Sequence, residues 1–591
     1  GNECEGDLPY SQLDGSDLFP EVIVGRMSLR STSELNAVVP KILNYEKATY
    51  LGNLDNYYNN ATMAGDPSSS GNSCAITKEY VKEILENHGF GDVDIKTSGS
   101  SWSSWMRNEL SDGTLFFNYR GYLGMSGFST GDIDDASNGY KLPFATVLTC
   151  GTGSFAEDQT SMSEKFFRAG SSSNPKGGVA AVGTATWNTH TLFNNIVDMG
   201  MYDGLLADKV ETAGAALASG KLALYNTYSN DPYEWIDAFT QWNNLMGDPA
   251  THLWTDTPVV MSVSHPSSIP YGTNYLDVVV VGPSGLPIEG ALVSIEERNV
   301  PTNIFTDGTG LARFYLENMT TGNTLITITK LNHKPYQGYV NILTNENLNV
   351  NIDSSQDILI SDGIDGNTGI IESGEIVGLS IPIENLGSQT VTGVYAVLSS
   401  TSDYVTVIDN NVTYGTVQAG ESVYGDNFNI SVSSAAIQGE DLELLLNIYD
   451  SQSNNWMSLV FVDVMGSHLI PASTINIQPG QTSSVNIDLR NFGSLSSSGV
   501  SAELSYSGNL ITINDSQGSW GTLSPGEQET SVNGFNLTLS NDIINGTQIP
   551  LNIHIQSSEG YDRMEIVNLQ AGNVSQSDPL GPDQYGYYIY D

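Results

Sequence analysis

Cys150 is the residue whose type and position most directly suggest chemistry. It follows the apolar run of residues 144–149 and precedes Gly151. An apolar strand that ends in Cys-Gly would place a thiol at the carboxyl edge of a sheet, where a following helix start favours the thiolate. A thiolate is a nucleophile, so this position indicates covalent catalysis. The alternative interpretation is a buried cysteine that packs as a small hydrophobic side chain.

A second apolar run ends beside the first one in the expected sheet. It covers residues 115–119 and continues into Arg120, Gly121 and Tyr122. Reacting groups in α/β sheets gather beyond the carboxyl ends of the strands, which is where both runs would place their last residues. We therefore take the residues that follow the two runs as the candidate site.

An acidic segment in the second half of the chain has the composition of a calcium-binding loop. It carries oxygen donors with glycines at the bends, namely Asp362, Asp365, Asn367, Glu372 and Glu375. Calcium takes roughly six to eight oxygen ligands from flexible loops. The spacing is not that of an EF-hand. We expect a structural Ca²⁺ site here, with a plain acidic turn as the alternative.

The elements that would position Cys150 alternate between helices and short apolar strands over residues 1–255. Residues 31–47 have helical periodicity, with Leu35, Val38, Val39 and Ile42 on one face. Residues 76–88 predict a second helix that stops at Gly89. Strands are expected at 115–119, 144–149 and 179–182, and further helices near 161–169, 192–206, 212–225 and 232–242. This alternation predicts a parallel α/β sheet.

The composition changes near residue 255, after which helical periodicity almost disappears. Residues 256–353 carry strand patterns separated by turn signals, which predicts a β-sandwich. Residues 354–465 and 466–572 form an internal repeat, in which Asn385-Leu386-Gly387 aligns with Asn491-Phe492-Gly493 at a separation of 106 residues. The repeat predicts two tandem β-sandwiches. Residues 573–591 look like a linker or the start of a further domain.

The overall charge excludes two classes of partner. The 591 residues include 67 acids and 21 Lys plus Arg, which gives a net charge of −46. Nucleic acid and anionic membrane surfaces both require clustered cations. No apolar run approaches the ~20 residues of a membrane span. With three cysteines, Cys4, Cys74 and Cys150, the chain does not rest on disulfides, and its composition is typical of a soluble secreted protein.

The N-terminal region resembles the gingipain-like cysteine peptidases of family C25, which share the caspase-like fold. The matching segments lie in the family's order between about residues 7 and 253, at 19–26, 117–121, 149–151, 163–168 and 246–249. The resemblance implies that Cys150 is the nucleophile. It also implies that the backbone around Gly121 and Gly151 supplies the oxyanion donors. Tyr122 occupies the position of the family's catalytic histidine.

A tyrosine does not replace that histidine, because a general base must titrate near pH 7 and a phenol has a pKa of about 10. Three histidines fall in the first domain. His88 ends a helix, and His252 follows a turn at the domain edge. His190 follows a core strand, in a stretch that the family uses to line the substrate pocket. His190 is therefore the substitute base that the sequence offers for Cys150.

Two interpretations of the function remain open. The first is a secreted, cell-surface gingipain-like cysteine endopeptidase, or its catalytically degraded relative, that acts on a protein or peptide substrate. The second is a non-catalytic surface adhesion or assembly protein that uses the peptidase fold as a scaffold. Cys74 stands where Arg-specific family members carry an acid, so the resemblance implies no preference for basic residues.

The predicted architecture is multidomain. An N-terminal α/β domain with a caspase-like, gingipain-like parallel sheet is followed by three all-β, Ig-like sandwiches. The resemblance implies bacterial secretion to the cell surface, with self-assembly or attachment through a region beyond Asp591. It also implies that the family's strands before Asp7 were either cleaved and stay associated or are missing.

Overall fold

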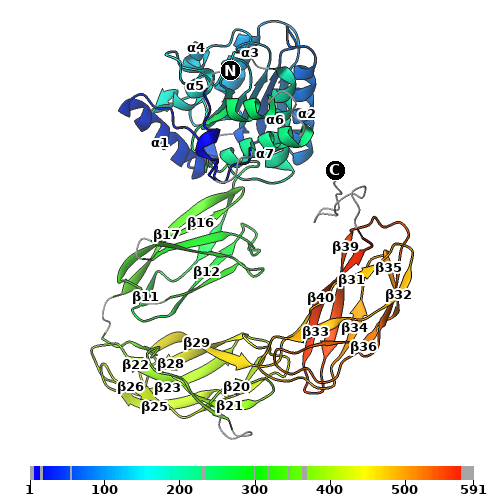
Figure 1. The fold of residues 1–591 in the computed structure, drawn as a ribbon. Helices are drawn as coiled ribbons and strands as arrows, with labels where there is room; N and C mark the ends of the chain where they lie inside the picture. Colours follow the sequence, from blue (N-terminus) through cyan, green and yellow to red (C-terminus); the bar gives the residue numbers. More distant parts are fainter. Residues whose placement is uncertain are drawn as a thin grey trace. The chain divides into compact units, whose positions relative to one another are not determined.

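A six-stranded sheet forms the centre of the N-terminal domain, in the order β2-β1-β3-β4-β7-β8 (Figure 1). The computed structural model describes residues 5–13, 18–53, 56–187, 190–228, 235–297, 300–316, 319–343, 347–362 and 369–573. The first five strands of the sheet are parallel, and β8 runs antiparallel to β7. The strands are β1 (Asn60–Gly65), β2 (Asp92–Lys96), β3 (Phe116–Arg120), β4 (Phe144–Val147), β7 (Ala180–Thr184) and β8 (Asn243–Met246), with a small β5 (Gly170–Ser171) and β6 (Asn174–Pro175) pair apart from them.

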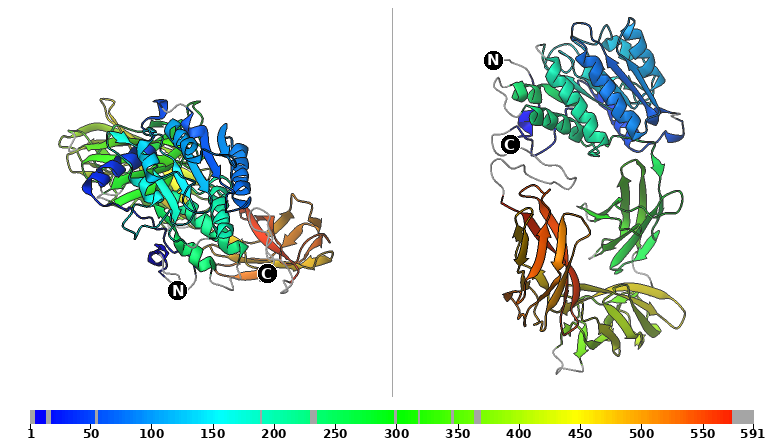
Figure 2. Two further views of the ribbon diagram at one scale, coloured as in Figure 1. Left: turned by 90° about the horizontal axis from the view of Figure 1, so that it is seen from above. Right: turned by 90° about the vertical axis from the view of Figure 1, so that its right-hand side faces the viewer.

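Helices cover both faces of this sheet, as Figures 1 and 2 show. They are α1 (Thr32–Glu46), α2 (Ser73–His88), α3 (Trp102–Asp112), α4 (Thr130–Asp135), α5 (Met162–Arg168), α6 (Thr191–Leu206), α7 (Ala213–Thr227) and α8 (Trp235–Trp242). Helices α2, α6 and α7 pack beside one another on one face, and α3, α4 and α5 pack on the other. The predicted parallel α/β architecture is confirmed. None of the described helices is long and apolar enough to cross a membrane.

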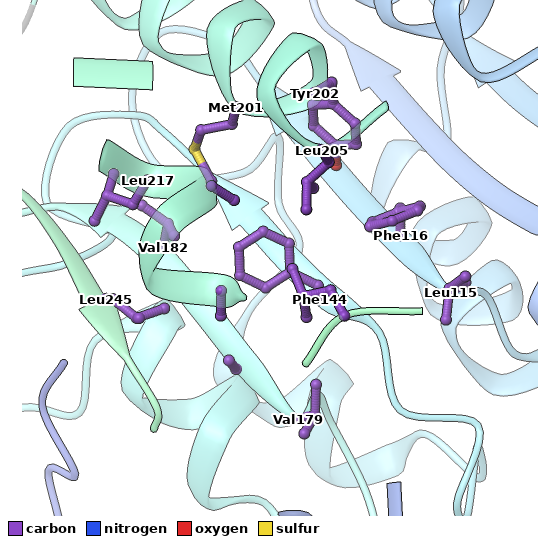
Figure 3. Packing of buried hydrophobic residues seen from close by; sticks show 14 of the residues in the cluster. Leu115, Phe116, Phe144, Val179, Val182, Met201, Tyr202, Leu205, Leu217 and Leu245 are labelled. Atoms are coloured by element: carbon purple, nitrogen blue, oxygen red, sulfur yellow. The ribbon is translucent and has the colours of Figure 1, made fainter. Parts of the chain in front are cut away.

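Successive side chains of each strand point to opposite faces of the sheet. Phe116 packs in a cluster with Tyr202 and other apolar side chains of α6 and α7 (Figure 3). Its neighbour Phe117 belongs to the cluster formed with α3, α4 and α5. Asn118 and Arg120 therefore share the face of Phe116. Their polar side chains enter the layer of α2 and α6, and both are buried there.

Local sequence signals set two helix ends as expected. Ser31 caps α1, because its hydroxyl oxygen accepts the N–H of Glu34 at 3.2 Å. Gly89 ends α2 with φ of +119°, in the left-handed region that glycine tolerates. The ends of both helices could therefore be predicted from single residues.

The prediction that four apolar residues of α1 share one buried face is wrong for two of them. Val38 and Ile42 are buried, whereas Leu35 and Val39 are exposed. The buried stripe is rotated because Lys41 is buried, and its ammonium group donates to backbone carbonyls in and after α5. A lysine is seldom buried, so apolar periodicity alone placed the stripe incorrectly.

The chain after the α/β domain is built from strands, as predicted. In the first β module, the sheets have the orders β10-β12-β15 and β11-β17-β16-β13-β14, with β9 paired to β17. Its strands are β9 (Val259–Val260), β10 (Ser262–Ser264), β11 (Ser268–Pro270), β12 (Tyr275–Val281), β13 (Leu292–Glu297), β14 (Val300–Phe305), β15 (Leu311–Tyr315), β16 (Gly322–Lys330) and β17 (His333–Leu343).

The second and third β modules have matching sheets. In the second module the orders are β18-β22-β26, β19-β21-β27-β24 and β20-β29-β28-β23-β25, and in the third they are β30-β33-β37, β32-β38-β35 and β31-β40-β39-β34-β36. The second module has β18 (Val350–Ile352), β19 (Leu359–Asp362), β20 (Ile371–Glu372), β21 (Ile376–Ser380), β22 (Pro382–Asn385), β23 (Val391–Ser400), β24 (Val405–Asp409), β25 (Asn411–Val417), β26 (Ser422–Tyr424), β27 (Phe428–Val432), β28 (Asp441–Tyr449) and β29 (Asn455–Met465). The third has β30 (Leu469–Pro471), β31 (Ile475–Ile477), β32 (Thr482–Val485), β33 (Asp488–Asn491), β34 (Ser501–Ser505), β35 (Ile511–Asp515), β36 (Gln517–Ser519), β37 (Gln528–Thr530), β38 (Phe535–Leu539), β39 (Gln548–Gln556) and β40 (Asp562–Ala571).

A buried asparagine repeats the same contacts in both modules. The Asn385 amide donates to the carbonyls of Gln389 and Val417 at 2.8 and 3.1 Å. Asn491 donates to Leu495 and Leu523 at 2.7 and 3.0 Å. Equivalent acceptors in the two modules, Gln389 with Leu495 and Val417 with Leu523, are 106 residues apart, as the two asparagines are. The structure therefore confirms the internal duplication.

Packing divides the chain into two compact units, and the division passes through the first β module. One unit comprises the residues up to 265 together with 277–312 and 325–339, and the other comprises 266–276, 313–324 and the residues from 340 onward. The expected boundary at residue 255 therefore lies inside the first unit. Strand β18 pairs with β22, so the second β module begins before the expected residue 354.

Candidate active site

Cys150 lies at the carboxyl edge of the sheet, three residues after the end of β4. Its side chain is 7% exposed. Strand β3 pairs in parallel with β4, and a single parallel β-bridge joins Leu123, beyond β3, to Cys150. The two strand ends that carry the candidate residues are therefore adjacent, as the sequence predicts.

Gly151 holds the backbone beside Cys150 in a left-handed turn with φ of +72°. Its N–H donates to the carbonyl of Thr186, beyond β7, at 2.6 Å. A Cβ atom on Gly151 would come within 2.9–3.0 Å of three atoms of the Trp187 ring. The predicted oxyanion role of the Gly151 N–H therefore requires its present bond to be exchanged.

Trp187 forms one wall beside Cys150. The indole is 57% exposed, and its Nε1 donates to a carboxylate oxygen of Glu157 at 2.7 Å. Because the ring lies over Gly151, it occupies the space next to the thiol-bearing residue. An exposed aromatic ring held by a hydrogen bond is a ready contact for a substrate side chain.

Gly121, directly after β3, lies close against the ring of Tyr119. A Cβ atom on Gly121 would lie 2.8 Å from Cζ of the Tyr119 ring, so this position excludes any larger residue. Tyr122, which stands where the resemblance implies a histidine, is 56% exposed. The carbonyl of Gly121 lies 4.0 Å from Sγ of the buried Cys74.

His190 precedes α6 and caps it. Its Nδ1 accepts the N–H of Leu192 at 3.2 Å, and its side chain is exposed. Since Nδ1 accepts, the proton of the neutral ring is on Nε2. His190 follows the carboxyl end of β7, the strand that pairs with β4.

The other two histidines of this domain belong to the opposite edge of the sheet. His88 is the last residue of α2, just before the start of β2. His252 follows β8, whose last residue, Met246, pairs with Ala181 near the start of β7. His252 instead approaches Glu211, with 3.4 Å between Nδ1 and Oε2. His190 is therefore the histidine of this domain that shares the edge of Cys150.

A polar group at the end of β1 was missed by the sequence analysis. Asp66 follows β1, is 7% exposed, and accepts a hydrogen bond from Ser126. The Ser126 hydroxyl is also 2.7 Å from the Tyr119 hydroxyl. The available signal was an acid directly after a strand, but residues 60–65 carry few β-forming side chains and the strand itself was not predicted.

A buried ionic cluster lies between β3, α2 and α6. Lys78 donates to Asp198 and Asn118, and all three side chains are 0% exposed. Burial lowers the pKa of Lys78 to about 8, against the opposing attraction of Asp198. This cluster was also missed, because Lys78 in a predicted helix is typical of a solvated face.

The acidic loop lies largely outside the described residues. Asp365, Asn367 and the side chain of Asp362 fall outside them. Glu375 accepts the N–H of Glu372 at 3.1 Å. Among the described residues no group of three or more His, Cys, Asp or Glu could hold a metal ion. Carboxylates at Glu372 and Glu375 suit a hard cation, and the calcium site stays a prediction.

Comparisons with known proteins agree with the fold of this domain. The model of "Peptidase family C25" matches residues 3–254. Gingipain R2 of Porphyromonas gingivalis is 23% identical over 324 residues, which cover 52% of this chain and 42% of the relative. Lys-gingipain HG66 of the same organism is 25% identical over 291 residues, covering 45% of this chain and 16% of the relative. This chain therefore spans less than half the length of these relatives.

Among solved structures, the Arg-specific cysteine proteinase gingipain R matches with a TM-score of 0.51 and 20% identity, covering 57% of this chain and 79% of that one. A complex of gingipain pro- and mature domains from Porphyromonas gingivalis matches with a TM-score of 0.50, 20% identity and coverage of 57% and 81%. At this identity the matches establish the fold alone. The predicted caspase-like, gingipain-like α/β fold is confirmed.

Proposed function

Residues 3–254 carry a gingipain-like domain of peptidase family C25, and we propose from this that the chain is a cysteine peptidase with Cys150 as its nucleophile. The observation that carries the proposal is the position of Cys150, at the carboxyl edge where the ends of β3 and β7 approach the turn after β4. Catalytic groups of parallel α/β sheets occupy this edge.

The substrate class that we propose is a protein or peptide outside the cell. The net charge of −46 disfavours the approach of acidic segments relative to neutral or basic ones, most strongly at low ionic strength. Trp187, exposed beside Cys150, would contact a substrate side chain. The location that we propose for the chain is extracellular or at the cell surface, as the resemblance to the gingipain family implies, and the net charge of −46 fits a soluble secreted protein.

In the proposed reaction the Cys150 thiolate attacks the scissile carbonyl carbon. Nε2 of His190 takes the thiol proton and later gives it to the leaving amine, and water then hydrolyses the thioester. This role needs an unprotonated Nε2, so the proton of the neutral ring must move to Nδ1. A protonated Nδ1 does not accept the N–H of Leu192, and we therefore expect His190 to release its cap when substrate binds.

A second function is favoured by two specific observations. The position of the expected histidine holds Tyr122, and the Gly151 N–H is already bonded to Thr186. A domain with neither a base nor a free oxyanion donor would bind peptides without cleaving them. The β modules would then serve adhesion or assembly at the cell surface.

Cleavage of a fluorogenic peptide library by the full chain separates the two functions. The peptidase proposal predicts turnover that is lost in Cys150→Ala and kept in the control Ser173→Ala, which changes an exposed side chain in the turn between β5 and β6. Peptide binding by wild type and Cys150→Ala alike, without any cleavage, would establish the non-catalytic function instead.

A further inference from the structure

Arg120 is a buried cation at the end of β3 that the proposed reaction does not use. Its side chain is 1% exposed. Nε donates to the Asn195 side-chain oxygen at 2.8 Å, and a terminal nitrogen donates to the carbonyl of Thr191 at 3.0 Å. Both acceptors belong to the beginning of α6. Arg120 therefore fastens the end of β3 to the helix turn that starts directly after His190.

The same helix turn is also tied to the strand that leads to Cys150. The buried amide of Asn194 donates to the Leu148 carbonyl at 3.4 Å and to the Thr184 hydroxyl at 3.1 Å. Leu148 lies two residues before Cys150, and Thr184 is the last residue of β7. The start of α6 thus contacts the ends of β3, β4 and β7 together.

The ionic cluster fixes α6 farther along its length. Asp198 pairs with Lys78 of α2, and Lys78 also donates to Asn118 of β3. A buried ion pair usually stabilises a fold no more than apolar side chains of the same volume would, because removing charges from water costs free energy. The contribution of this cluster is therefore a defined orientation of α6 rather than added stability. Asn118 and Arg120 share one face of β3, and their contacts together fix the orientation of α6 on the sheet.

We propose that Arg120 is a positioning residue that sets the place of His190 relative to Cys150 by holding the first turn of α6. The inference rests on the proposed function. An arginine suits this task, because its planar group offers several donors in fixed directions and so reaches two acceptors at once. Misplacing reacting groups by about 1 Å costs roughly 100-fold in rate, so the loss of these bonds should be visible in the chemistry of Cys150.

The test follows the alkylation of Cys150 by iodoacetamide in the full chain between pH 5 and 9, with each cysteine resolved by peptide mapping. Arg120→Gln should slow alkylation at pH 6 by about 10- to 100-fold. It should also shift the rise in rate toward the pH of an ordinary thiol, and Arg120→Lys should restore part of the loss. Lys41→Gln is the matched control, because Lys41 is another buried cation whose acceptors are carbonyls outside α6. It should lower thermal stability and leave the pH profile unchanged.

The possible outcomes separate this inference from the proposed function. If His190→Gln loses reactivity at pH 6 while Arg120→Gln keeps the wild-type profile, Arg120 does not position the site and the proposed function stands. If Cys150 of the wild type is alkylated with the pH profile of an ordinary thiol, and His190→Gln has the same profile, the proposed function is wrong. The positioning role of Arg120 is then wrong as well. If Arg120→Gln does not fold, Asn195→Ala decides, since it removes one acceptor of Arg120, and an unchanged profile in that variant overturns the inference.

Discussion

The substitution Gly121→Ala tests how tightly the end of β3 is built. The new Cβ atom would lie 2.8 Å from Cζ and 3.0 Å from Cε1 of Tyr119, and closer still to its hydroxyl. Tyr119 is 1% exposed, so its ring has no free space to enter. Moving the ring would also break its 2.7 Å contact with Ser126, which is bonded to Asp66.

The expected cost combines two effects. Overpacking a buried site costs about 1–3 kcal/mol, and the loss of a buried hydrogen bond costs about 1 kcal/mol. A total near 3 kcal/mol corresponds to roughly 100-fold faster amide hydrogen exchange by global opening. Amide hydrogen exchange measured in peptides that cover β3 and β4 reports the stability of the α/β domain separately from that of the β modules.

Gly124→Ala is the matched control in the same loop. Gly124 has φ of +58° and nothing within 4 Å of an added Cβ atom, so the control carries only backbone strain of about 1–2 kcal/mol. Tyr119→Phe in the Gly121→Ala background should recover part of the loss, since it removes the closest atom. Equal exchange rates in Gly121→Ala and Gly124→Ala would refute the steric argument.

Three further predictions concern other parts of the chain. Asn385→Ala and Asn491→Ala should each destabilise their own β module by about 3 kcal/mol, because the two side chains share three equivalent hydrogen bonds. Asn491→Ala should cost about 1 kcal/mol more, because the Asn491 Oδ1 also accepts the N–H of His468 at 3.1 Å. Hydrogen exchange measures both costs, and a difference above ~2 kcal/mol would contradict the equivalence. Burial, with Asp94 as the next cause, raises the pKa of Glu109 from 4.5 to about 7. Because the folded protein holds the Glu109 proton more tightly than the unfolded chain does, this proton stabilises the fold fully below pH 4.5, and the stabilisation is lost as the pH rises through about 7. Glu109→Gln should therefore have a higher melting temperature than wild type at pH 8 but not at pH 4.5. Parallel melting curves across this range would show that Glu109 does not titrate there. Calcium should raise the melting temperature of the second β module, and Glu375→Gln should reduce that shift. If neither Ca²⁺ nor EDTA changes the melting temperature, the predicted calcium site is wrong.

The strands found from sequence are those whose buried positions hold large apolar side chains. Residues 115–119 and 144–149 read as continuous apolar runs because parallel strands are buried on both faces. Strand β1, with the sequence Asn-Ala-Thr-Met-Ala-Gly, is buried in the same sheet but carries no comparable local signal. Its conformation is set by pairing with β2 and β3, which tertiary packing provides.

The candidate site divides in a similar way. The place of Cys150 follows from a strand end, which is a local feature of the sequence. The contacts of Arg120 with α6, and of Lys78 with Asp198, join residues that are 71 to 120 positions apart. Charged side chains are normally exposed, so no sequence pattern predicts that these three are buried together. The fold had to be known before the polar contacts that hold the start of α6 could be found.

The pH dependence of Cys150 alkylation, in wild type and His190→Gln, tests the central claim that His190 activates Cys150. We expect fast labelling of wild type at pH 6–7, a loss of about 10- to 100-fold at that pH in His190→Gln, and no labelling at this position in Cys150→Ala. An ordinary thiol profile with an apparent pKa of about 8.5 in both wild type and His190→Gln would contradict the claim.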